Sequence, residues 1–126
     1  MATICLNMIV RDEAAVIERC LASVRPYIDS WVIVDTGSSD DTMAKIEAAM
    51  AGIPGTLHQR PWRDLGHNRS EAAQLAYASG ADYLLFMDAD DRFAPQPGFA
   101  WPLLGADAYA LMLEYGGLRY SRTVLV

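Results

Sequence analysis

Hydrophobic residues along this chain fall into two alternating patterns. The first is a short, largely apolar run, which is typical of a strand buried on both faces of a sheet and in Thr3–Val10 is rich in β-branched residues. It predicts strands over Thr3–Val10, Trp31–Val34 and Tyr83–Met87. A shorter strand is predicted over 56–59, and two more over 108–115 and 118–126.

The second pattern has helical spacing and lies between the strands. One apolar stripe predicts a helix over 12–24 that Pro26 ends: Val16, Ile17, Cys20, Leu21 and Val24. A second helix, which Ser38 or Ser39 would cap, buries Met43, Ile46 and Met50. A third runs from Asn68 to Ser79 and stops at Gly80.

The alternation of strand and helix predicts an α/β fold, a three-layer sandwich with a mainly parallel sheet, in a single domain over 1–126. Ligands of such sheets bind beyond the carboxyl ends of the strands. Polar residues follow three of the predicted strands there, at Asp35, Arg60–Arg69 and Asp88–Asp91. We expect these three groups to converge at one edge of the sheet.

Composition removes several classes of function. A formal net charge of -6 disfavours nucleic-acid binding, which needs a basic surface. No apolar run approaches the roughly 18 residues of a membrane span. Cys5 and Cys20 lie on apolar stripes without the spacing of metal ligands, so we expect buried free thiols in a cytoplasmic protein.

The acidic segment predicts a site for a divalent cation. Asp88 and Asp90 are two residues apart at a strand end, so in an extended chain both side chains project to one side, and Asp91 adds charge. A hard cation with oxygen ligands, Mg²⁺ or Mn²⁺, relieves their repulsion. The alternative is a solvated acidic turn. Because residues 88–91 follow a fully apolar strand and lie in line with the other polar groups, we favour the cation site over the solvated turn.

Two further residues are candidates for binding a ligand. Asp35 leaves a strand where a carboxylate can accept hydrogen bonds from a nucleobase or a ribose; the alternative is that it only caps the turn. Arg69, near a helix start, is suited to a diphosphate. Arg60 and Arg63 are expected to be solvated, and His67 is as well suited to a local hydrogen bond as to a ligand.

Four segments within residues 3–93 resemble family 2 glycosyltransferases of the GT-A fold: Leu6–Glu13, Val34–Thr42, Gly66–Ala72 and Met87–Asp91. The resemblance implies a nucleotide-diphosphate sugar donor, a UDP- or GDP-sugar, and Mn²⁺ or Mg²⁺. In that scheme Asp35 binds the base, Arg69 lies near the nucleotide, Asp88 faces the nucleoside, Asp90 binds the metal with Asp88, and Glu13 borders the base pocket.

The same resemblance implies transfer to an acceptor hydroxyl with inversion, using a carboxylate as base. The base is not identified; Asp91 is the candidate, with Asp107 and Glu114 as alternatives. We expect an incomplete GT-A core that self-associates through its C-terminal strands and transfers little sugar alone. A nucleotide-sugar-binding module without turnover is the alternative. A dehydrogenase or methyltransferase is disfavoured, because Arg11–Glu13 replaces the glycine-rich turn after the first strand.

Overall fold

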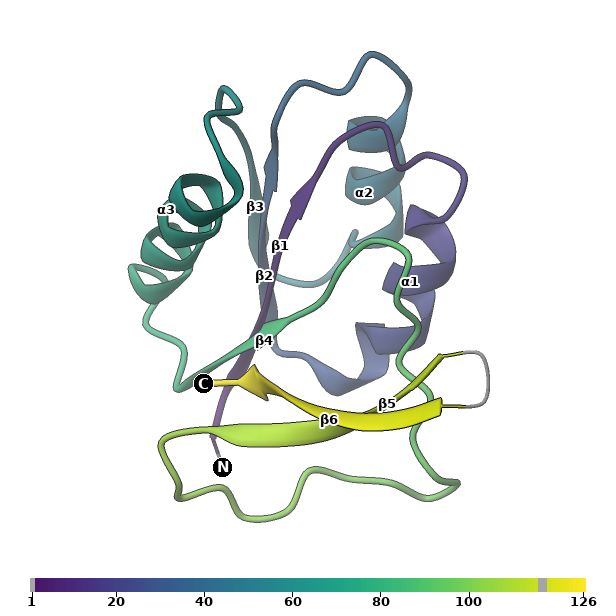
Figure 1. Cartoon of the computed structure of the whole chain (residues 1–126), viewed down its shortest axis with the longest axis vertical. Helices are drawn as coiled ribbons and strands as arrows, with labels where there is room; N and C mark the ends of the chain where they lie inside the picture. The colour runs from purple at the N-terminus through teal and green to yellow at the C-terminus, as the bar shows by residue number, and fades with distance from the viewer. Residues whose placement is uncertain (1, 116–117) are drawn as a thin grey trace.

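A computed structural model describes residues 2–115 and 118–126. Figure 1 shows the elements in chain order: β1 Ile4–Val10, α1 Ile17–Val24, the short 3-10 helix η1 Arg25–Tyr27, β2 Ser30–Asp35, α2 Thr42–Ala49, β3 Gly55–Gln59, α3 Leu65–Tyr77, β4 Tyr83–Phe86, β5 Tyr109–Tyr115 and β6 Leu118–Leu125.

The strands form one sheet in the order β3-β2-β1-β4-β6-β5. The first four strands of that order are parallel to one another. The last two strands of the order are added antiparallel, with β6 pairing with β4 and β5 pairing with β6. The predicted α/β class with a mainly parallel sheet is therefore confirmed. β1 lies between two parallel neighbours, which is why its residues are almost all buried.

Helices cover both faces of the sheet. Figure 1 shows α1 and α2 on one face and α3 on the other, so the molecule has the three layers that the sequence predicts. The side chains of alternate residues of β1 point to opposite faces of the sheet. Leu6 and Met8 join the larger core with α1 and α2, whereas Cys5 packs in a smaller cluster that contains Ala76 of α3.

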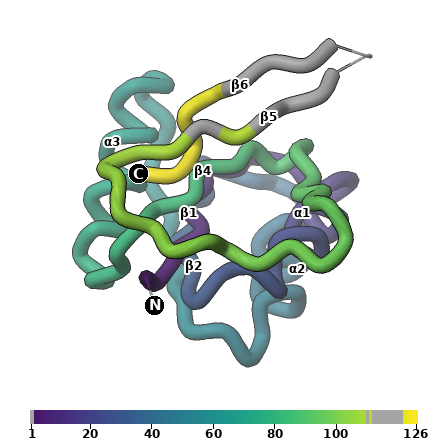
Figure 2. The backbone as a smooth tube through the Cα atoms, turned by 90° about the horizontal axis from the view of Figure 1, so that it is seen from below, coloured from purple at the N-terminus to yellow at the C-terminus, as the bar shows by residue number. Residues whose placement is uncertain are grey.

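The segment between β4 and the C-terminal hairpin returns along the outside of the molecule. Figures 1 and 2 show it descending beside α1 and crossing below the sheet before β5 begins. Aromatic contacts attach it: the rings of Phe93 and Phe99 pack on Tyr27 of η1, and Trp101 donates a hydrogen bond to the Tyr27 carbonyl at 2.7 Å. This attachment returns the chain to the edge of the sheet where β6 pairs with β4.

Three predicted helix starts differ from the structure. α1 begins at Ile17 rather than Asp12, because Asp12 has φ 51, a left-handed conformation that a helix cannot contain. α2 follows Asp41, and no side-chain cap forms, so the predicted serine cap is wrong. α3 begins at Leu65, before the predicted Asn68, because the Asp64 carboxylate accepts from the His67 backbone at 2.7 Å.

Two smaller expectations can be compared with the structure. Cys5 and Cys20 are free and buried, as the sequence predicts. Among the described residues, helices are too short or too polar to reach across a lipid bilayer. Self-association through the C-terminal strands stays a prediction; in the sheet, β6 is enclosed between β4 and β5, and β5 is the outermost strand.

The contact between Gly55 and Trp31 makes a stability prediction. A Cβ atom on Gly55 would lie 2.3 Å from the Trp31 ring, which is buried and donates to the Ile53 carbonyl. We therefore expect Gly55→Ala to lower the free energy of unfolding by about 1–3 kcal/mol, the usual cost of overpacking. Urea unfolding measures this change.

Gly66→Ala is the matched control. Its nearest contact would be Asp64 Oδ1 at 3.6 Å, an ordinary van der Waals distance, and alanine favours the helix. We expect no loss of stability there. Equal effects of the two substitutions would contradict the close approach of β3 to Trp31.

Candidate functional site

The loops that follow the parallel strands meet at the carboxyl edge of the sheet. Thr36, just after β2, donates its backbone N–H to the carbonyl of Val10, the last residue of β1, at 3.0 Å. Arg69 of α3 forms an ion pair with Asp88, which follows β4. The structure therefore brings Arg69 and Asp88 together, as expected from the sequence. Asp35 ends β2 at the same edge of the sheet, and its approach to the other two groups stays a prediction.

The acidic residues form a compact turn. The Asp91 backbone N–H donates to the Asp88 carbonyl at 3.0 Å, and the Asp91 carboxylate accepts from the Asp88 N–H at 2.9 Å. One carboxylate oxygen each from Asp88, Asp90 and Asp91 lies within 4.8 Å of the other two. The extended geometry expected from the sequence is wrong, because β4 ends at Phe86. The turn gathers the carboxylates instead and adds Asp91 to them.

Two side chains of helix α1 hold backbone carbonyls of this turn. The Cys20 thiol lies 3.6 Å from the Asp88 carbonyl, and the Arg19 guanidinium donates to the Asp90 carbonyl at 3.2 Å. Burial, together with the nearby Asp91 and Asp90 carboxylates, raises the pKa of Cys20 to about 12. The thiol therefore stays protonated and able to donate.

Two arginines face the acidic turn. Arg69 Nη2 donates to Asp88 Oδ1 at 3.0 Å. Arg122, on β6, has Nη1 at 4.0 Å from Asp88 Oδ2 and Nη2 at 3.7 Å from Asp91 Oδ2. The sequence analysis missed Arg122. It stands in no recognisable motif, and only the pairing of β6 with β4 brings its strand beside the turn.

Asp35 closes the turn that follows β2. Its Oδ1 accepts from the backbone N–H groups of Gly37 and Ser38 at 2.8 Å each, and its Oδ2 accepts from the Ser38 hydroxyl at 2.5 Å. The side chain is nearly enclosed, since Asp35 is only 2% exposed. Turn capping, which the sequence left open, is thus observed, and contact with a nucleobase stays a prediction.

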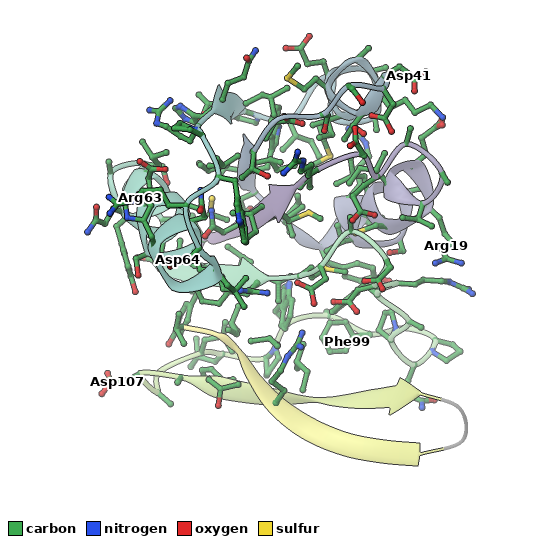
Figure 3. The ribbon with its side chains drawn as sticks, turned by 45° about the horizontal axis from the view of Figure 1, so that its top comes forward. Arg19, Asp41, Arg63, Asp64, Phe99 and Asp107 are labelled. Carbon is green, nitrogen blue, oxygen red and sulfur yellow. The ribbon has the colours of Figure 1, made fainter. Side chains whose placement is uncertain are left out.

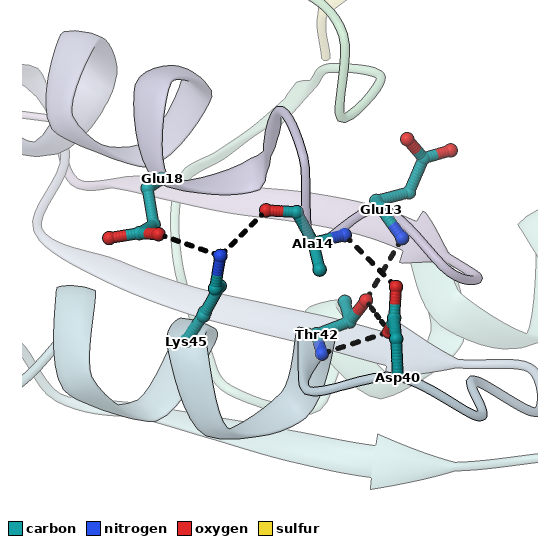
Figure 4. Close-up of polar contacts among 6 residues, drawn as sticks. All are labelled: Glu13, Ala14, Glu18, Asp40, Thr42 and Lys45. Carbon is teal, nitrogen blue, oxygen red and sulfur yellow. Dashed lines mark hydrogen bonds and ion pairs between the residues drawn. The ribbon is translucent and has the colours of Figure 1, made fainter.

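A hydrogen-bond network joins the loops after β1 and β2. Asp12 accepts from the Ser39 N–H at 2.6 Å and donates its own N–H to the Ser38 hydroxyl. Figure 4 shows its continuation, in which Glu13 donates to the Thr42 hydroxyl and Ala14 donates to the Asp40 carboxylate. The two loops therefore form one supported wall of the site.

The pKa of Glu13 is affected by its burial and by nearby carboxylates. Desolvation first, and then the charges of Asp90, Asp40 and Asp88, raise the pKa of Glu13 above its ordinary value. Two of these charges, those of Asp90 and Asp88, belong to the acidic turn. This agrees with the expectation that Glu13 borders the ligand site; a direct contact with a ligand stays a prediction.

A shallow pocket of about 240 Å³ opens beside Arg69 on the α3 face. Its walls come from β1, β4 and α3: Asn7, Met8, Ile9, Phe86, Arg69, Ser70, Ala72 and Ala73. The Asn7 side chain donates from Nδ2 to the carbonyls of Val32 and Ala72 at 3.0 and 3.1 Å. These bonds link β1 to both β2 and α3 next to the pocket.

The remaining candidates fall outside this constellation. Asp107 lies near the start of β5, and in Figure 3 it is on the opposite side of the molecule from Arg19, which holds the acidic turn. The side chain of Glu114 lies outside the described part of the structure. His67 donates its backbone N–H to Asp64 as part of the α3 cap. Asp91 is thus the candidate base that lies at the site.

The raised pKa of Glu13 predicts a pH-dependent stability. A carboxyl with a raised folded-state pKa contributes nothing below the unfolded pKa, where both states are protonated. It destabilises the fold increasingly as pH rises above the unfolded pKa, and the cost is complete above the folded pKa. We therefore expect Glu13→Gln to increase the free energy of unfolding at pH 7. The gain should vanish below about pH 4, near the ordinary pKa of glutamate.

Urea unfolding at the two pH values measures it. Glu47→Gln on α2, an exposed glutamate, is the control. A gain that is independent of pH, or equal in the control, would show that the pKa of Glu13 is not raised in the folded protein.

Comparison with known proteins agrees with this geometry. The family model described as Glycosyl transferase family 2 matches residues 5–97. A TPR repeat-containing protein from Synechococcus elongatus is 43% identical over 92 residues, 73% of this chain and 21% of that protein. An uncharacterized glycosyltransferase from Rickettsia felis is 31% identical over 96 residues, 76% of this chain and 31% of that protein. The chain thus spans less than a third of each of these relatives.

Solved structures share the fold. S. aureus TarS in complex with UDP superposes with a TM-score of 0.60 at 20% identity, over 70% of this chain and 27% of that one. Glucosyl-3-phosphoglycerate synthase from Mycobacterium tuberculosis, in complex with Mn²⁺, UDP and glucosyl-3-phosphoglycerate, has a TM-score of 0.53 at 25% identity, over 70% of this chain and 33% of that one. The GT-A likeness expected from the sequence is confirmed, and the chain belongs to glycosyltransferase family 2.

Proposed function

We propose that this chain forms the donor-binding part of a glycosyltransferase, which transfers a sugar from a nucleotide-diphosphate donor to an acceptor hydroxyl with inversion. The observation that carries the proposal is the acidic turn of Asp88, Asp90 and Asp91, flanked by Arg69 at the carboxyl edge of the sheet. Carboxylates and a guanidinium side by side suit a ligand that combines a cation with an anionic diphosphate.

The donor set of the turn fits a divalent cation. Its three carboxylates offer hard oxygen ligands within 4.8 Å of one another, the ligand type that Mg²⁺ and Mn²⁺ prefer. Solved relatives support the choice: the mycobacterial synthase is described with Mn²⁺ and UDP, and also with Mg²⁺ and UDP. Such a cation would neutralise charge that develops on the departing diphosphate.

The remaining residues have distinct roles in the proposal. Arg69, in the second turn of α3, binds the diphosphate, and the adjoining pocket lined by Asn7 and Phe86 receives part of the nucleoside. Glu13, in the loop after β1, borders the donor site on the side of Asp90 and Asp88, whose charges raise its pKa. Asp35 acts chiefly by holding its loop in shape, since three hydrogen-bond donors of that loop already occupy its carboxylate. UDP and GDP are both candidate nucleotides.

Inversion requires a base that takes the proton of the acceptor hydroxyl. Asp91 is the candidate at the site. Its Oδ2 accepts from the Asp88 N–H, and its carboxylate also belongs to the cation cluster. Both interactions would occupy oxygens that a base needs in order to receive a proton. The assignment of Asp91 as base therefore stays a prediction, and so does turnover by this chain alone.

Calorimetry tests the donor site directly. We expect UDP or GDP to bind, and to bind more tightly when Mn²⁺ is present, because a cation held by Asp88, Asp90 and Asp91 would offset the negative charge of the diphosphate. Asp90→Ala should abolish the effect of Mn²⁺ while leaving residual nucleotide binding through Arg69. Asp107→Ala is the control, since it removes an equal charge on the side of the molecule opposite Arg19.

Nucleotide binding that is indifferent to Mn²⁺ in the unaltered chain would contradict the role of Asp90. A donor-consumption assay on the same protein separates the transferase from the alternative. Tight, Mn²⁺-dependent binding without consumption of UDP-sugar would favour a binding module.

A further inference from the structure

The two oxygens of the Asp88 carboxylate face two arginines from different parts of the chain. Oδ1 accepts from Arg69 of α3 at 3.0 Å, and Oδ2 lies 4.0 Å from Nη1 of Arg122 on β6. The second guanidinium nitrogen of Arg122 reaches Asp91 at 3.7 Å. Arg122 therefore lies between the carboxylates of Asp88 and Asp91. On Asp88 it faces Oδ2, the oxygen that does not contact Arg69.

The two arginines hold the turn with different strength. The Arg69 contact has hydrogen-bond length, whereas both Arg122 contacts exceed the usual limit of about 3.2 Å and are ion pairs only. The Arg122 side chain is also 44% exposed. An exposed, loosely held ion pair contributes little free energy, so Arg122 can leave the carboxylates at small cost.

Arg122 and a cation would use the same carboxylates. The oxygens that face its guanidinium belong to Asp88 and Asp91, two of the three residues in the cation cluster. A guanidinium and a divalent cation cannot both lie against one carboxylate oxygen without repelling each other. A bound cation therefore leaves Arg122 without its partners, beside the place where the cation-bound diphosphate would lie.

We propose that Arg122 is a donor-binding residue that alternates between two anions. Without a cation it neutralises Asp88 and Asp91; with a cation bound it turns to the diphosphate, whose paired oxygens match the fork of a guanidinium. This inference rests on the proposed donor site. The proposal also gives the C-terminal hairpin a function, because β6 carries Arg122, a residue for binding phosphate that lies outside the four motifs.

The exchange predicts two effects of opposite sign for Arg122→Gln. Mn²⁺ measured alone, by calorimetry or by its electron paramagnetic resonance signal, should bind roughly two- to fivefold more tightly, because a competing cation is gone. UDP measured at saturating Mn²⁺ should bind roughly tenfold more weakly, because a charge-assisted contact is lost. A purely structural role for Arg122 would weaken both.

Two further variants make the test specific. Arg122→Lys keeps the charge but loses the fork, so Mn²⁺ affinity should stay close to that of the unaltered protein while UDP affinity falls. Arg63→Gln makes the same change in net charge at a side chain that Figure 3 shows on the outer side of the molecule beside Asp64. It should leave both affinities unchanged. Circular dichroism confirms that each variant is folded.

Each outcome bears on a separate statement. Tighter Mn²⁺ binding with unchanged UDP affinity, or weaker UDP binding with unchanged Mn²⁺ affinity, overturns the exchange, because each removes one of its two halves. Arg63→Gln reproducing the effects of Arg122→Gln also overturns it, since general charge would then explain them. Failure of the unaltered chain to bind either Mn²⁺ or UDP overturns the proposed function itself.

Discussion

Mutual repulsion among carboxylates at one edge of the sheet governs the arrangement of the site. Parallel strands must end on the same side, so the loops after β1 and β4 bring Glu13 and the acidic turn of Asp88–Asp91 into one region. Positively charged and hydrogen-bonding groups surround the negative charge of the turn. Arg69 and Arg122 lie against the turn, α1 holds its carbonyls, and the pKa of Glu13 is raised. A divalent cation would supply positive charge in the same place.

Stability and function draw on different parts of the same loops. Asp12, Asp35 and Asp40 use their carboxylates on backbone N–H groups and hydroxyls of the loops after β1 and β2. These three carboxylates hold the loops in shape, since each already accepts hydrogen bonds from donors of those loops. The carboxylates of Asp88 and Asp91 are instead paired with exposed guanidinium groups, those of Arg69 and Arg122. The loops after β1 and β2 therefore support the site, whereas the Asp88–Asp91 turn is the part whose charge is open to a ligand.

Periodicity predicted most of the fold because the core of this protein is regular. The alternation of strands and helices yielded the class, and the burial of β1, β2 and β4 follows directly from their apolar runs. The helix starts were less predictable. The left-handed Asp12 and the Asp64 cap are decided by single hydrogen bonds and dihedral angles, which leave no periodic signal.

The site was predictable where it follows a strand and unpredictable where topology decides. Asp88, Asp90 and Arg69 were found because each lies next to a strand end or helix start that the pattern marks. Arg122 comes from an antiparallel strand added beyond β4, and nothing local distinguishes it from a solvated arginine. Asp35 was predicted to lie at the edge, but only the structure shows its carboxylate turned into its own loop.

The central claim is that the turn of Asp88, Asp90 and Asp91 is the cation site of this domain. Nuclear magnetic resonance of the ¹⁵N-labelled chain tests it, with Mn²⁺ added far below one equivalent and Mg²⁺ as the diamagnetic control. The account predicts that the amide signals of residues 88–91 and of Glu13 broaden first, followed by those around Arg69. Broadening that begins at Asp40 and Asp41, or that spreads evenly over the acidic surface, would contradict it.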